Sequence, residues 1–90
     1  MSHPAAEASR AKTAHIERTL VKLDKLMSDA QDVIARELSN METKEEFPVV
    51  HRLGDSIFDQ LEKSRRAIYG GALIELARVH TSTRAYRKNK

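Results

Sequence analysis

The four histidines are the residues of this chain that would first suggest metal chemistry, and their spacing argues against it. His3, His15, His51 and His80 include no pair four residues apart and no His-Glu-x-x-His motif, the usual helical arrangements for zinc. The chain has no cysteine that could complete such a site. The sequence therefore predicts no metal ion and no cofactor. It places His51 and His80 on the surface, near opposite ends of a helix.

Arginine and carboxylate side chains are the remaining candidates for catalysis. Opposed arginines in an all-helical dimer could clamp an anionic substrate, and the candidates are Arg18, Arg52, Arg65 and Arg66. No serine lies in a nucleophile-elbow motif, and Gly70-Gly71 lacks the lysine and spacing of a phosphate-binding loop. We therefore expect a non-enzymatic protein with no catalytic residue and no small-molecule substrate.

Basic side chains gather at the C-terminus, where they could bind nucleic acid. Residues 76–90 carry 5 basic and no acidic side chains, whereas residues 1–75 carry 11 basic and 13 acidic ones. A few phosphate contacts support salt-sensitive binding without sequence readout. Because a short basic tail is more commonly only solubilising, nucleic-acid binding is the alternative hypothesis. Its residues are Arg78, Arg84, Arg87, Lys88 and Lys90, with Tyr86 among them.

An apolar stripe at alternating steps of four and three residues predicts a first helix from about residue 9 to residue 40. With a gap at Glu37, the stripe comprises Ile16, Leu20, Leu23, Met27, Ala30, Ile34 and Met41. Leu26, Val33 and Leu38 widen it beyond the two positions per heptad of a coiled coil. The width favours a helix bundle.

A second stripe predicts a helix from about residue 49 to residue 83. It comprises Val50, Leu53, Ile57, Leu61, Ile68, Ala72, Leu76 and Val79, at a mean period of about 3.6 residues. Gly70-Gly71 are poor helix formers within this predicted helix, but the apolar residues on either side of them keep the same helical spacing. Two readings are open: a break between two shorter helices, or a place where another backbone or a ligand approaches closely.

The remaining segments complete a single domain. Residues 1–8 show no periodicity and predict a disordered leader, and residues 84–90 form the basic tail. A turn is expected at residues 41–48, where Thr43 and Glu46 have the spacing of a capping box and Pro48 restarts the chain. The absence of a long apolar run or a hydrophobic signal core leads us to expect a cytoplasmic protein that does not bind membranes.

These elements predict an all-α helical hairpin of two long antiparallel helices. Two helices alone cannot cover stripes this broad, so we expect a homodimer that closes into a four-helix bundle. The predicted function is that of a regulatory or adaptor protein that binds a protein partner through helix-helix contacts. The predicted interaction residues are Ile16, Leu20, Leu23, Leu26, Met27, Val33, Ile34, Phe58, Tyr69 and Leu73.

Overall fold

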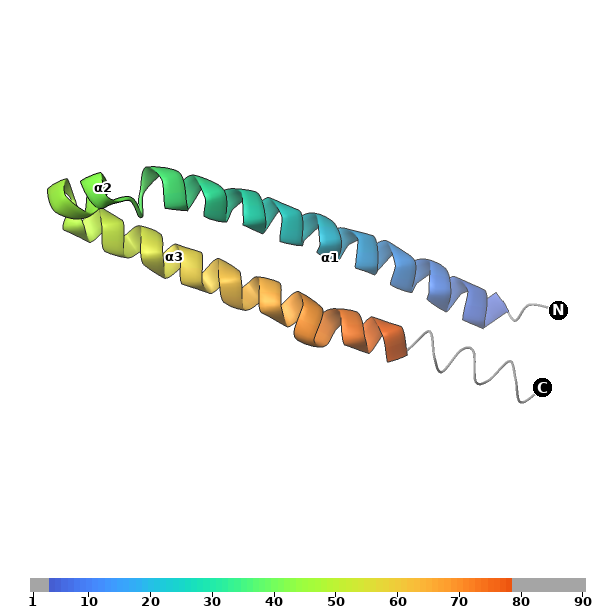
Figure 1. Ribbon diagram of the computed structural model, residues 1–90. Helices are drawn as coiled ribbons and strands as arrows, with labels where there is room; N and C mark the ends of the chain where they lie inside the picture. The colour runs from blue at the N-terminus through green and yellow to red at the C-terminus, as the bar shows by residue number, and fades with distance from the viewer. Residues whose placement is uncertain (1–3, 79–90) are drawn as a thin grey trace.

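The computed structural model describes residues 4–78, with side chains from residue 10 onward, and shows two long antiparallel helices joined by a short one (Figure 1). α1 spans Pro4–Glu37, α2 spans Met41–Glu46 and α3 spans Pro48–Ala67. A π-helical turn, η1, covers Ile68–Ala72, and α-helix then continues to residue 78. Residues 4–78 contain no strand. The all-α helical hairpin predicted from the two stripes is therefore confirmed.

The helix ends differ from the sequence prediction by a few residues. α1 begins at Pro4, inside the segment 1–8 for which the sequence predicts disorder, and ends at Glu37 rather than near residue 40. The predicted basic tail, residues 84–90, lies outside the described residues. None of the helices described has both the length and the apolar character needed to cross a membrane.

Asn40 organises the turn between the long helices. Its side-chain oxygen accepts a hydrogen bond of 2.8 Å from the backbone N–H of Thr43, which caps α2. Its side-chain amide donates at 2.8 Å to the carbonyl of Arg36 in the last turn of α1. The cap of the helix in this turn is therefore Asn40 and not the predicted pair of Thr43 and Glu46. Pro48 begins α3, as its restricted backbone favours.

Gly70-Gly71 widens the second long helix without breaking it. The backbone N–H of Leu73 donates to the carbonyl of Ile68, a separation of five residues that defines a π-turn. A methyl group added to Gly70 or to Gly71 would meet no atom within 4 Å. The predicted break is thus absent, and no other part of the described chain approaches the two glycines closely.

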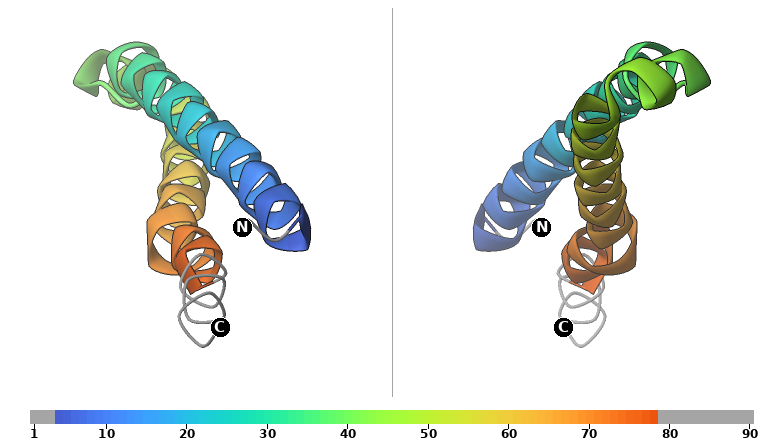
Figure 2. Two further views of the ribbon diagram at one scale, coloured as in Figure 1. Left: turned by 90° about the vertical axis from the view of Figure 1, so that its right-hand side faces the viewer. Right: turned by 90° about the vertical axis from the view of Figure 1, so that its left-hand side faces the viewer.

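The contact between the long helices is narrow, and its apolar part is small. Seen nearly end-on, the helices cross and then diverge toward the chain termini (Figure 2). Ile34 on α1 and Ile68 in η1 are the buried apolar side chains of the described residues. Gly54 of α3 is also buried, because a Cβ atom there would lie only 2.8 Å from the Cβ of Leu38. This glycine lets α3 approach the end of α1 closely.

Substitution of Gly54 tests this close approach. Gly54→Ala forces Leu38 or the backbone to move, and overpacking of this kind costs about 1–3 kcal/mol, offset by up to about 1 kcal/mol of helix propensity. We expect a net loss of unfolding free energy in urea titrations followed by circular dichroism.

Gly71→Ala is the matched control, because its added methyl group meets open space. It should leave the unfolding free energy unchanged or raise it by up to about 1 kcal/mol. Equal effects of the two substitutions would show that α3 does not pack against α1 at Gly54.

Candidate protein-interaction face

The side of α1 that faces α3 is the polar edge of the first stripe. Ile34 is buried and Leu20 and Met27 are half-buried, as the stripe predicts. Between them, however, the buried side chains are Asp24 and Gln31, which lie seven residues apart on one face of the helix. The contact between the helices therefore contains polar side chains that neighbour the stripe as well as part of the stripe itself.

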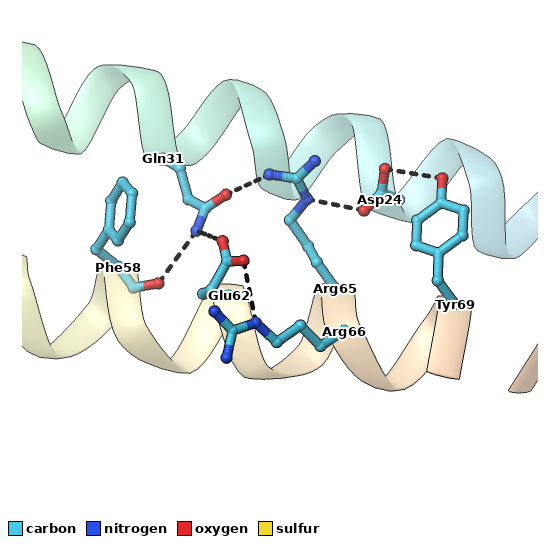
Figure 3. A network of polar contacts seen from close by, with 7 residues as sticks. All are labelled: Asp24, Gln31, Phe58, Glu62, Arg65, Arg66 and Tyr69. Atoms are coloured by element: carbon cyan, nitrogen blue, oxygen red, sulfur yellow. Dashed lines mark hydrogen bonds and ion pairs between the residues drawn. The ribbon is translucent and has the colours of Figure 1, made fainter. Parts of the chain in front are cut away.

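Asp24, Gln31, Glu62, Arg65 and Tyr69 form a polar network across the two helices (Figure 3). The Arg65 guanidinium donates from Nε to Asp24 Oδ1 at 2.8 Å and from a terminal nitrogen to Gln31 Oε1 at 2.6 Å. The Tyr69 hydroxyl donates to Asp24 Oδ2 at 3.1 Å, so both carboxylate oxygens of Asp24 accept hydrogen bonds. Charge-assisted bonds of this length are among the strong ones in proteins.

Gln31 joins the two ends of the polar network. Its side-chain amide donates to Glu62 Oε2 at 3.0 Å and to the backbone carbonyl of Phe58 at 3.2 Å, while its oxygen accepts from Arg65. Glu62 also forms an ion pair with Arg66 at 3.4 Å. Since Gln31 is almost fully buried, these partners satisfy groups that would otherwise be costly to bury.

The polar network shifts the acidities of its members. The hydrogen bond from Arg65 lowers the pKa of the Asp24 carboxyl below its usual 3.8, with a smaller contribution from Tyr69 and an opposing one from burial. The amide of Gln31 lowers the pKa of Glu62 in the same way. Asp24 in turn raises the pKa of Arg65 and the pKa of Tyr69. The geometry thus favours the charged form of both carboxyl groups.

The apolar edge of the first stripe is left exposed. Ile16, Leu23, Leu26 and Val33 of α1 are all exposed in the hairpin. On α3 the same holds for Val50, Leu53 and Ile57. We call these seven side chains the apolar face. Single exposed apolar residues are common, but a group of them on neighbouring helices is typical of an interaction site.

Helix geometry places both parts of the apolar face on one side of the hairpin. Successive residues of a helix are about 100° apart around its axis. On average, the exposed apolar residues of α1 lie roughly a quarter turn around the helix from the residues that contact α3, such as Asp24 and Gln31. The exposed apolar residues of α3 are displaced from its contact positions by a similar angle in the same rotational sense. Because α1 and α3 run antiparallel, equal displacements in one sense point to the same side. The two parts of the apolar face therefore point to the same side of the hairpin. The α3 part lies closer to the hairpin turn than most of the α1 part, because Gln31 pairs with Phe58 and Asp24 with Arg65.

The structure divides the predicted interaction residues into two groups. Ile16, Leu23, Leu26 and Val33 belong to the apolar face, whereas Leu20, Met27, Ile34, Phe58 and Leu73 are buried or half-buried. Tyr69 belongs to the polar network, although half of its surface is exposed. Asp24, Gln31 and Gly54 are not among the residues predicted from the sequence. An isolated glycine within a helical pattern is the signal that could have identified Gly54.

The candidate catalytic and metal-binding residues do not converge. Arg65 and Arg66 are each engaged by carboxylates of the hairpin, and His51 lies 3.5 Å from Asp55 on its own helix. Arg18 lines a shallow depression on the opposite side of α1, beside Val21 and two lysines. Among the described residues no three metal-ligating side chains come together. Arg78 is exposed, and the other basic tail residues lie outside the described part of the chain.

Comparison with known proteins finds no family model, no curated protein and no solved structure that matches this chain. The apolar face and the polar network are therefore the features from which a function can be inferred.

The polar network predicts how stability depends on pH. Because folding lowers the pKa of Asp24 and of Glu62, both carboxylates contribute stability that is complete above their ordinary values of 3.8 and 4.5. This stability is lost as the pH falls through the lower, folded-state values. We expect the thermal midpoint to decline below about pH 4, and Asp24→Asn to remove much of that decline. Circular dichroism measured over a pH series tests both.

Asp59→Asn is the control, because Asp59 is an exposed carboxylate of α3 outside the polar network. It should preserve the pH profile of the original chain. An unchanged profile in Asp24→Asn would show that Arg65 and Asp24 do not pair in solution.

Proposed function

We propose that this protein is a small non-enzymatic regulatory or adaptor protein that acts by helix-helix association through its apolar face. The observation that carries the proposal is the position of this face. It lies beside the contact between α1 and α3, and its seven side chains are between 37% and 58% exposed. A surface of this kind suits an amphipathic helix that packs its own apolar side chains against it.

The rigidity of the hairpin supports this proposal. Arg65, Asp24 and Gln31 hold the two helices in one rotational setting, so that the apolar face is already formed before a partner binds. Preorganisation of this kind reduces the entropic cost of association. The central residues of the face, Leu26 and Val33, are the expected anchors of the contact.

Site-specific photo-crosslinking in the native cell tests the proposal. A photoreactive amino acid at Leu26 should capture a discrete partner protein, whereas the same group at Val21 should not. Val21 is 47% exposed and Leu26 is 56% exposed, but they lie on different sides of α1. The captured protein is then identified, purified and titrated against the chain by calorimetry.

The titration decides the role of the apolar face. Leu26→Asp should weaken binding of the purified partner by about 100-fold, since it buries an unpaired charge, and removal of residues 84–90 should have little effect. Binding that survives Leu26→Asp but is lost with the tail would reject the proposal in favour of a charge-driven contact.

A further inference from the structure

We infer that a second copy of this chain, antiparallel to the first, occupies the apolar face when no other helix is bound. The inference rests on the proposed function in that it names an occupant of the same face. Two properties of the molecule support it: the position of the apolar face and the distribution of charge along the hairpin.

The position of the apolar face is compatible with two-fold symmetry. The face contains residues of both α1 and α3 on one side of the hairpin, so two copies stacked face to face bring four helices around a common core. Each copy presents the same surface to the other, as an isologous interface requires. Ile16, Leu23, Ile57 and their neighbours would then form the interior of the bundle.

Charge distinguishes an antiparallel second copy from a parallel one. Residues 23–62, which include the hairpin turn, carry 4 basic and 10 acidic side chains and a net charge of −6. Residues 10–22 and residues 63–78 each carry 4 basic side chains and 1 acidic one, a net charge of +3 for each segment. A parallel copy would stack acidic half on acidic half. An antiparallel copy places the acidic half of each hairpin over the basic half of the other.

Light scattering during size exclusion gives the first test. We expect a mass twice 10.2 kDa for the chain. Leu26→Asp should weaken the dimer by about 100-fold and yield a single-chain mass on dilution, while Val21→Asp, on the other side of α1, should remain a dimer. A single-chain mass for the unsubstituted protein at every concentration would overturn the inference. So would dissociation by Val21→Asp and not by Leu26→Asp.

Disulfide crosslinking gives a second test that leaves the charge of the apolar face unchanged. The chain has no cysteine, so single substitutions report one position each. Leu26→Cys lies near the middle of the apolar face and should oxidise to a covalent dimer. Glu45→Cys lies in α2 at the hairpin turn, and antiparallel copies hold the two such residues about 50 Å apart, too far for a disulfide. Efficient crosslinking through Glu45→Cys would instead show a parallel dimer and overturn the inference.

The two proposals fail in different ways. If photo-crosslinking at Leu26 captures only a second copy, the adaptor function fails and the homodimer stands. If the chain is monomeric and Leu26 captures another protein, the homodimer fails and the adaptor function stands.

Discussion

The pairing of Asp24 with Arg65 is the interaction on which the rest of the structure depends. It joins residues 41 positions apart, and its geometry sets both the register and the rotation of α1 against α3. Any rotation of α1 that moved Leu23 toward the interior would take Asp24 and Gln31 away from Arg65. Breaking this part-buried, hydrogen-bonded pair would leave each charge without its partner between the helices. The polar network thus holds the helices in the one setting that leaves the apolar face outside.

This setting is costly for an isolated hairpin, because seven apolar side chains remain in water. The cost is consistent with the limits of two-helix packing, in which each helix offers the other only a narrow strip of side chains. A stripe as wide as the one from Ile16 to Ile34 needs neighbours on two sides. In a larger bundle, α3 covers the polar edge of the stripe and a further helix covers the apolar edge. The width of the stripe and the polar contact with α3 are therefore both consistent with a helix that has neighbours on two sides.

The helices and their antiparallel order are predictable from sequence because each depends on local periodicity and chain connectivity. Which edge of the stripe faces α3 cannot be predicted in this way. It depends on the pairing of Asp24 with Arg65, which no local pattern indicates. Similarly, Thr43 and Glu46 have the spacing of a capping box, but Asn40 supplies the cap because it also reaches the carbonyl of Arg36. The π-turn contains the glycine pair, but only the structure shows that the second long helix continues through these glycines.

The small apolar core and the exposed apolar face together mean that a helix bound to the face would add stability to the hairpin. Ile34 and Ile68 bury little area, so much of the stability of the isolated hairpin must come from the polar network and from local helix contacts. A helix bound to the apolar face adds burial that only the folded hairpin offers, and therefore stabilises it by mass action.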